Sequence, residues 1–290
     1  MKKKLHFMCV GVQKAGTSTF HDILQQHPDI NLPINKETHF FRDRDKFEKG
    51  IDHYFSYYFK DSPTPFWGEI DPEYIYFKDC AEAIFKTFGK IKIIIILRNP
   101  VDRAYSHYQM TKSRSLESLD FITAIKNENE RLTTHYNKIH FSYISRSLYA
   151  EQIERFESFF GKENLKVLLF ENLIKNTDAT INETMSFLNI PSYNFDYSIK
   201  SNVASEPKNK LLQNFIYKPN KLKSAVGKLI PVKKIKDKIM LTLAEKNKKA
   251  APKTALSIDQ KQMIYNTYFK NEIDTLESKL NRDLSHWRYE

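Results

Sequence analysis

Short apolar runs alternate along the chain with segments of helical periodicity. Leu5–Val10 is an apolar run of strand length, and after Gly11 and Gly16 the apolar residues recur at helical spacing. Ile91–Leu97 is rich in isoleucine, as expected for a strand buried on both faces of a parallel sheet. Asn99-Pro100 then offers an N-cap and a first helical residue. The pattern predicts two strand–loop–helix units.

The rest of the chain continues this alternation. Leu148–Phe160 has the period of an amphipathic helix, Lys166–Phe170 reads as another buried strand, and Ile258–Leu280 as a long terminal helix. We find no internal repeat and no low-complexity linker. The sequence therefore predicts an α/β fold, with one P-loop-like domain over residues 1–290 and a central parallel β-sheet flanked by helices.

Composition excludes several other classes of protein. The chain has 290 residues, of which 41% are hydrophobic, so it can bury a full core and is not disordered. Cys9 and Cys80 are its two cysteines, too few for a disulfide scaffold. Its longest apolar run, Ile93–Leu97, is far shorter than the roughly 18 residues of a membrane span. The apolar run behind Lys2–Lys4 is too short for a signal peptide, so we expect a cytoplasmic protein.

Positive charge is concentrated in one segment, Lys218–Lys253, called here the lysine block. It contains 12 Lys, no Arg, Asp237 and Glu245, so it carries +10 of the chain's net charge of +11. The block is expected to be a mostly helical insertion at about residues 215–254, with lysines on a solvated face. Alternatively, it docks onto a polyanion or anionic lipid, which would place the protein at the periphery of a membrane.

The first chemical motif is the loop Gly11-Val12-Gln13-Lys14-Ala15-Gly16-Thr17-Ser18-Thr19. Its glycine spacing is that of a Walker A loop, but Thr17 stands where that motif has lysine, and Lys14 lies earlier. Such a loop still directs backbone N–H groups and a helix N-terminus at an anion, and the hydroxyls add donors. An ordinary βα turn is the alternative. The motif favours a phosphate site without the usual grip on a triphosphate and Mg²⁺.

The second motif runs from Arg98 to Tyr108. Arg98 follows a buried strand directly, at the end where ligands bind in open α/β sheets. Ser106 lies about two helical turns further on, and Arg98 and Ser106 together could bind a second phosphate. Arg103 and His107 are better read as structural residues. An arginine at a strand end can equally be structural.

These residues resemble the sulfotransferases that use 3′-phosphoadenosine 5′-phosphosulfate (PAPS). The first motif resembles their 5′-phosphosulfate loop, and the second their 3′-phosphate motif. Lys36-Glu37-Thr38-His39-Phe40-Phe41 is similar to a segment of the heparan sulfate 3-O- and N-sulfotransferases. Further segments match this family: Gly68–Tyr74, Leu148–Ile153, Phe170–Leu173 and Leu284–Trp287.

The resemblance implies a mechanism and a set of site residues. The sulfuryl group would move in line from PAPS to a hydroxyl or amine of a glycan, glycolipid or small alcohol, leaving 3′-phosphoadenosine 5′-phosphate (PAP), with no metal. Glu37 would be the catalytic base, and Lys14 would bind the leaving phosphate. Contacts to the donor are implied for Lys14, Ala15, Gly16, Thr17, Ser18, Thr19, Arg98, Ser106, Tyr149, Lys253 and Thr254. Contacts to the acceptor are implied for Lys36, His39, Glu69 and Asp71.

Departures from the family pattern affect mainly the acceptor. Ile70 stands where the heparan-type enzymes often have lysine, and Ala251-Pro252-Lys253-Thr254 is at best a degenerate form of their cofactor loop. Two other classes remain as alternatives. A P-loop kinase or NTPase is disfavoured by Thr17. A non-catalytic polyanion or nucleic-acid binder is disfavoured because the lysine block lacks interleaved aromatic residues.

Overall fold

The computed structural model describes residues 4–198, 205–217, 242–243, 246–250 and 255–289. They form two compact units, which are described separately. Unit 1 comprises Met1–Arg103, Arg146–Ser201 and Gln262–Glu290, and unit 2 comprises Ala104–Ser145 and Asn202–Lys261. The prediction of one domain over the whole chain stays a prediction. Within the described residues, no helix is both long and apolar enough to cross a membrane.

A five-stranded parallel sheet forms the centre of unit 1, and this confirms the predicted fold class. The strand order is β2-β3-β1-β4-β5, and each neighbouring pair is parallel. The strands are β1 (Phe7–Gly11), β2 (Ile30–Asn31), β3 (Phe66–Ile70), β4 (Lys92–Leu97) and β5 (Leu165–Leu169). Ile93–Leu97 is fully buried, which explains the run of isoleucines at the middle of the sheet.

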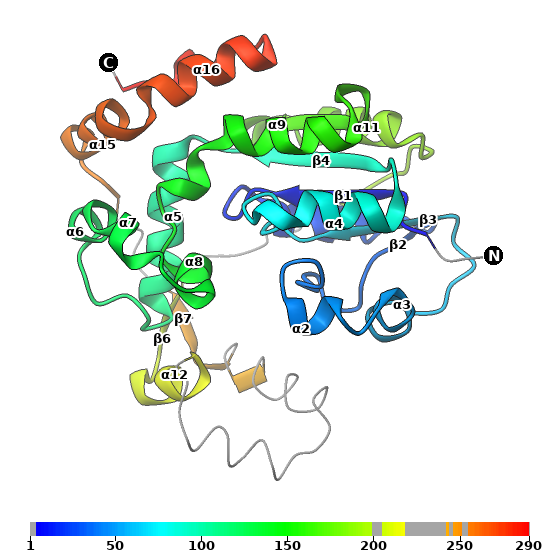
Figure 1. Cartoon of the computed structure of the whole chain (residues 1–290), viewed down its shortest axis with the longest axis horizontal. Coiled ribbons are helices and arrows are strands. Elements are labelled where there is room, and N and C mark those ends of the chain that lie inside the picture. The colour runs from blue at the N-terminus through cyan, green and yellow to red at the C-terminus, as the bar shows by residue number, and fades with distance from the viewer. Residues whose placement is uncertain (1–3, 199–204, 218–241, 244–245, 251–254, 290) are drawn as a thin grey trace. The chain divides into compact units, whose positions relative to one another are not determined.

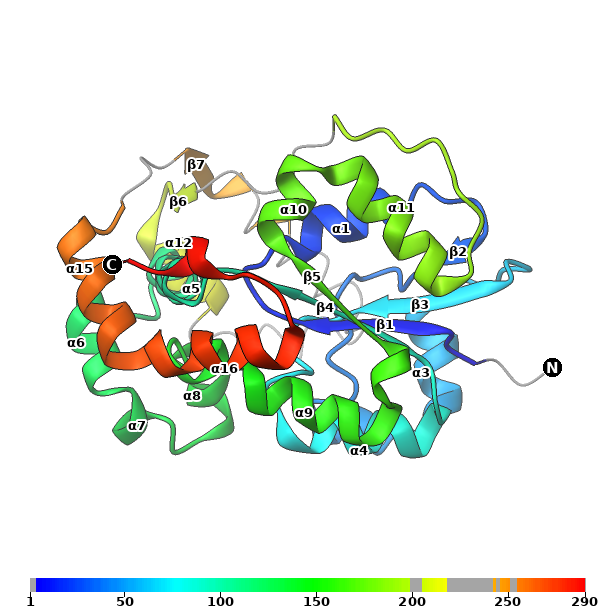
Figure 2. The same ribbon diagram turned by 90° about the horizontal axis from the view of Figure 1, so that it is seen from above.

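Helices cover both faces of this sheet. Figure 2 shows α1, α10 and α11 on one side of the strands and α4 and α9 on the other. These helices are α1 (Thr17–Leu24), α4 (Lys78–Phe88), α9 (Tyr149–Phe160), α10 (Phe170–Lys175) and α11 (Thr177–Leu188). The short helices α2 (Arg44–Phe47) and α3 (Ile51–Tyr58) connect β2 to β3. The sheet is thus the middle layer of unit 1 (Figures 1 and 2).

The C-terminal segment of unit 1 is helical, as the periodicity predicts. Helix α15 (Ile258–Ile264) passes through a π-helical turn, η3 (Tyr265–Phe269), into α16 (Lys270–Leu280). Three short 3₁₀ turns complete the elements near unit 1: η1 (Ser145–Ser147), η2 (Lys162–Asn164) and η4 (Ser285–Trp287). Three of the four boundaries between the units fall within α5, η1 and α15.

Unit 2 contains most of helix α5 and several short elements. Helix α5 (Pro100–Ser113) begins at the proline, and Asn99 Oδ1 accepts bonds from the N–H groups of Val101 and Asp102 at 3.0 and 3.2 Å, which confirms the predicted N-cap. The other elements are α6 (Phe121–Lys126), α7 (Glu128–Arg131), α8 (His135–His140), β6 (Ser205–Pro207), α12 (Lys210–Tyr217) and β7 (Lys248–Ala250). β6 and β7 pair antiparallel.

Two buried glutamates stabilise the loops of unit 2. Glu117 Oε2 accepts from Arg131 at 2.9 Å and from the Tyr143 hydroxyl at 2.8 Å. Glu128 accepts from the backbone N–H groups of Ile144 and Ser145 at 2.6 and 2.8 Å. Buried carboxylates with such donors support the connection between α7 and η1.

Candidate active site

The loop between β1 and α1 is held in one conformation by backbone contacts. Val12 N donates to Ile96 O of the neighbouring strand at 2.9 Å. Lys14 and Gly16 both have positive φ, 75° and 79°, and a Cβ on Gly16 would lie 2.9 Å from the ring of Phe170. Glycine is therefore required at position 16 both for its conformation and for the close approach of that ring.

Arg98 lies against this loop at the end of β4. Its guanidinium donates to Lys14 O at 2.9 Å and stacks over the Phe170 ring, 4.8 Å from the centroid. The Tyr149 hydroxyl, on α9, donates to Arg98 O at 2.9 Å. Arg98 and Tyr149, both predicted from sequence, thus converge on the loop that carries Lys14.

Two segments that resemble the family by sequence, Phe170–Leu173 and Leu284–Trp287, meet next to Asn99. Asn99 Nδ2 donates to Trp287 O at 3.1 Å, and Trp287 Nε1 donates to Glu171 Oε1 at 3.2 Å. Trp287 is 1% exposed, so this C-terminal tryptophan is a buried anchor. The contacts explain why Phe170–Leu173 and Leu284–Trp287 carry family residues although neither belongs to the loop.

Lys36 connects the loop region to a carboxylate. Its ammonium donates to Glu37 Oε1 at 2.8 Å and to Thr17 Oγ1, at the start of α1, at 3.4 Å. Burial would raise the pKa of Glu37, but the positive charges of Lys36 and His39 outweigh burial and hold the pKa below its ordinary value. Glu37 is therefore ionised at neutral pH beside the first turn of α1.

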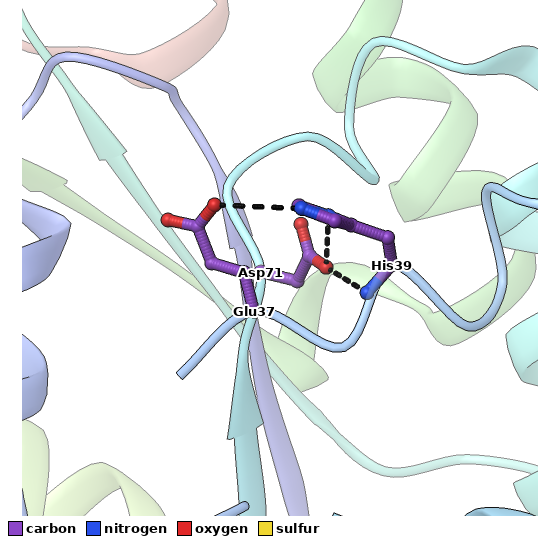
Figure 3. A group of neighbouring side chains, drawn as sticks. All are labelled: Glu37, His39 and Asp71. Atoms are coloured by element: carbon purple, nitrogen blue, oxygen red, sulfur yellow. Dashed lines mark hydrogen bonds and ion pairs between the residues drawn. The ribbon is translucent and has the colours of Figure 1, made fainter. Parts of the chain in front are cut away.

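His39 lies between two carboxylates (Figure 3). Its Nδ1 is 2.9 Å from Asp71 Oδ2, which also accepts from His39 N at 2.7 Å, and its Nε2 is 3.8 Å from Glu37 Oε2. Burial would lower the pKa of His39, but the Asp71 carboxylate outweighs burial and raises it. Asp71 is fully buried and follows β3 directly.

Glu69 holds the segment that carries Glu37 and His39 through a hydrogen bond from Thr38. Its two oxygens accept from the hydroxyls of Thr38, Tyr54 and Tyr74 at 2.5, 2.5 and 2.9 Å, and it is 0% exposed. Burial and the charge of Asp71 raise the pKa of Glu69 to about 7, although these hydroxyls act in the opposite direction. Its surroundings favour a role in holding Thr38, which lies between Glu37 and His39, over direct contact with an acceptor.

A further buried carboxylate, Glu73, escaped the sequence analysis. It accepts from Gln13 of the loop at 2.9 Å and pairs with the Arg42 guanidinium, while Arg146 lies 3.8 Å away. Burial would raise the pKa of Glu73, but the two arginines lower it. The sequence signal that could have indicated Glu73 is the alternation of acidic residues at Glu69, Asp71 and Glu73. In the structure all three accept hydrogen bonds from the segment Thr38–Arg42.

One group among the described residues has the atoms to hold a metal ion. Ligand atoms of Glu37, His39 and Asp71 lie within 4.8 Å of one another. The two ring nitrogens of His39 face different carboxylates, so a metal ion would have to replace one of these contacts (Figure 3). In the structure these residues form a cluster of charged side chains around the imidazole ring of His39.

Most of the predicted site residues therefore lie near the carboxyl ends of β1, β3 and β4. They are the loop residues Lys14–Thr19, Arg98, Tyr149, and the acceptor-side residues Lys36, Glu37, His39, Glu69 and Asp71. Ser106 is half-buried on α5, in the part of that helix assigned to unit 2. Lys253 and Thr254 lie outside the described residues, as does most of the lysine block, residues 218–241, 244–245 and 251–253.

Comparison with known proteins adds family relationships. Residues 4–250 match the model of the sulfotransferase domain. Heparan sulfate glucosamine 3-O-sulfotransferase 5 from Homo sapiens is 28% identical over 67% of this chain and 56% of its own length. Bifunctional heparan sulfate N-deacetylase/N-sulfotransferase 4 from Mus musculus is 30% identical over 67% of this chain and 23% of its own. The chain thus spans about half and about a quarter of these relatives.

A solved structure agrees with the fold. The crystal structure of a sulfotransferase from Alicyclobacillus acidocaldarius has a TM-score of 0.70 and 24% identity, covering 98% of this chain and 99% of that chain. The likeness supports the parallel sheet flanked by helices that unit 1 displays. The match over residues 4–250 shows that the chain belongs to the sulfotransferase domain family.

Proposed function

We propose that this chain transfers the sulfuryl group of PAPS to a hydroxyl or amine of a glycan, glycolipid or small alcohol. Membership of the sulfotransferase domain family supports the reaction type. The names of the relatives, heparan sulfate 3-O- and N-sulfotransferases, support a carbohydrate acceptor.

The observation that carries this proposal is the position of Lys36. Its ammonium joins Thr17, at the helix N-terminus next to the loop, to the carboxylate of Glu37. A donor bound at the loop and an acceptor bound at Glu37 would therefore meet at Lys36. In-line transfer needs this juxtaposition of donor, base and positive charge more than covalent help from the protein.

The donor side fits an adenosine bisphosphate. The first N–H groups of α1 have no partner within the helix, and with Lys14 and the hydroxyls of Thr17, Ser18 and Thr19 they suit the 5′-phosphate. Arg98 and Ser106 are the proposed ligands of the 3′-phosphate, with Tyr149 and, beyond the described residues, Lys253 and Thr254 as further contacts. The donor supplies an activated sulfuryl group, so no other activation is needed.

The acceptor side supplies a base. Glu37 is ionised at neutral pH, because Lys36 and His39 lower its pKa, so it can take the proton of an attacking group. Lys36 donates to Oε1, which leaves Oε2 directed towards His39. Lys36 would also neutralise charge on the group in transfer.

Ligand-dependent melting tests the donor assignment. PAP should raise the melting temperature, because a ligand that binds only the folded state stabilises it by mass action. AMP lacks the 3′-phosphate and should shift it far less, and ATP less than PAP. Equal shifts with AMP and PAP would remove Arg98 and Ser106 from their role, and preference for ATP would favour a kinase or NTPase.

A further inference from the structure

Glu73 joins the donor side of the proposed site to the acceptor side. Its Oε1 accepts a hydrogen bond from Gln13 Nε2 at 2.9 Å, in the loop between β1 and α1, called here the donor loop (residues 12–16). Its Oε2 accepts from the Arg42 guanidinium, in the segment after β2, called here the acceptor segment (residues 36–42). One carboxylate therefore holds the donor loop with one oxygen and the acceptor segment with the other.

The chemistry of Glu73 strengthens both contacts. An ionised carboxylate can only accept, so the amide nitrogen of Gln13, and not its oxygen, must face Glu73. Glu73 is 4% exposed, and burial would raise its pKa, but Arg146 and Arg42 lower it. The carboxylate is therefore ionised at neutral pH. Hydrogen bonds to an ionised group are about twice as strong as those between neutral groups.

The backbone around Glu73 is fixed to the central sheet. Glu73 N donates to Asp71 Oδ1 at 3.2 Å, directly after β3, and Ile75 N donates to Val10 O of β1 at 2.9 Å. A Cβ on Gly11, the last residue of β1, would lie 2.5 Å from the Ile75 side chain. The chain after β3 thus packs against the start of the donor loop, and the Glu73 side chain extends from a rigid backbone.

The donor loop has further support that does not involve Glu73. Val12 N donates to Ile96 O, and the Arg98 guanidinium donates to Lys14 O, both at 2.9 Å. These contacts tie the loop to β4, on its other side. Loss of the Gln13 contact should therefore leave the loop able to bind PAP.

The acceptor segment likewise has support besides the link to Glu73. Asp71 Oδ2 accepts from His39 N at 2.7 Å, and the Tyr74 hydroxyl accepts from Phe40 N at 3.0 Å. The contribution of Glu73 is therefore a fixed relation between two parts that are each held separately. In-line transfer depends on this relation, because a displacement of about 1 Å can reduce the rate by about 10²-fold.

We propose that Glu73 is a positioning residue for sulfuryl transfer, which fixes Lys14 of the donor loop relative to Glu37 of the acceptor segment. The inference rests on the proposed sulfotransferase function and adds to it a residue that takes no direct part in the transfer. Glu73 acts through Gln13 and Arg42. It keeps the group that binds the leaving phosphate in register with the base.

The link can be broken on its donor side without removing a charge. Gln13→Met keeps the length of the side chain and removes the donor to Glu73, whereas Gln13→Lys restores a donor as an ammonium group. Gln26→Met is the matched control, because Gln26 lies just beyond the C-terminal end of α1 and its Nε2 donates to Asp196 O at 3.0 Å.

The assay separates the rate of transfer from donor binding. Transfer from ³⁵S-labelled PAPS to chitosan oligosaccharide, which offers hydroxyl and amine groups on one sugar, gives kcat and the KM for PAPS. Hydrolysis of PAPS by water is followed without the oligosaccharide. The affinity for PAP is measured by calorimetric titration, and the melting temperature without ligand reports whether each variant is folded.

We expect Gln13→Met to reduce kcat by about 10–100-fold and to change the KM for PAPS and the affinity for PAP by less than about threefold. Gln13→Lys should recover most of the wild-type kcat, because its ammonium can donate to the Glu73 carboxylate. Gln26→Met should keep the wild-type kcat. If Gln13→Met fails to fold, Gln13→Ala takes its place with the same expectations.

The acceptor side of the link provides an independent check. If Gln13 and Arg42 act through one carboxylate, Gln13→Met should reduce kcat much less in an Arg42→Met background than in the wild type, because the link is already broken. The same fold reduction in both backgrounds would show that the two residues act independently, which contradicts the role given to Glu73.

Three further results would overturn the inference. The first is wild-type kcat in folded Gln13→Met. The second is an equal loss of kcat and PAP affinity, since Gln13 would then act only through donor binding. The third is Gln13→Lys as slow as Gln13→Met, since a donor to Glu73 would then not matter. Failure of the proposed function looks different, because the wild-type protein would then neither transfer label nor hydrolyse PAPS.

Discussion

Replacing Lys36 by methionine should move the acidic limb of the pH–rate profile upward. Lys36 Nζ lies 2.8 Å from Glu37 Oε1, and its charge is a principal reason that the pKa of Glu37 is below its ordinary value. Methionine keeps much of the length and removes the charge. The base would then be protonated, and inactive, over a wider range of acidic pH.

The size of this shift follows from the distance. Coulomb attraction at 2.8 Å is about 1.5 kcal/mol in water and about 6 kcal/mol at the effective dielectric of a protein surface. The Glu37 side chain is 34% exposed and that of Lys36 18%, so we take the lower part of this range, about 1.5–3 kcal/mol. A free energy of this size corresponds to a movement of the acidic limb by about one to two pH units towards higher pH.

The assay is kcat/KM for sulfuryl transfer as a function of pH, which reports the ionisation of the free enzyme. The advantage of this assay is that the pH of the acidic limb does not depend on how much the maximum kcat/KM falls in Lys36→Met. Lys86→Met is the matched control, because Lys86 forms an exposed pair with Glu82 on α4. An acidic limb at the wild-type pH in Lys36→Met would show that the observed base is not Glu37.

Three other predictions follow from the same geometry. Glu37→Gln should reduce turnover by about 10²–10⁴ and leave PAP binding, measured by melting, almost unchanged; wild-type turnover would require another base. Because the pKa of Glu69 is raised to about 7, its contribution to folding stability is largest at low pH and is lost as pH rises from about 4.5 to 7. The free energy of unfolding of the wild type, measured relative to that of Glu69→Gln by urea titration, should therefore fall by about 3 kcal/mol over this range. Curves of unfolding free energy against pH that run parallel for the two proteins would contradict this prediction. Acceptor affinity should weaken as salt is added. This salt dependence should mostly disappear when glutamine replaces Lys233, Lys234, Lys236 and Lys238, while PAP binding stays intact. An unchanged salt dependence in this variant would indicate that the lysine block is only a solvated surface.

Local sequence predicted the parts of the site that local structure determines. The isoleucines of β4 indicate a doubly buried strand, and Asn99-Pro100 begins α5 because cap and proline act within one turn. The loop that begins at Gly11 joins β1 to α1, so its place between a strand and a helix N-terminus could be predicted from its order along the chain. These features need no knowledge of distant residues.

Contacts between distant segments could not be read in the same way. The pairing of His39 with Asp71 spans 32 positions and depends on the loop after β3 reaching the segment after β2. Glu73 has no local signal beyond its alternation with two other acids, although it contacts Gln13 of the loop. Glu69 was assigned to the acceptor by resemblance, whereas its burial under three hydroxyls follows only from the packing of Tyr54 and Tyr74.

The most direct test of sulfuryl transfer is a single-turnover experiment with ³⁵S-labelled PAPS and the purified chain. The reaction is quenched over time, with PAP and labelled acceptor separated and counted for a panel of glycans, glycolipids and small alcohols. We expect label to appear in an acceptor together with an equal amount of PAP, and both to form about 10²–10⁴ times more slowly in Glu37→Gln. Unchanged PAPS alongside turnover of ATP would contradict the proposed function.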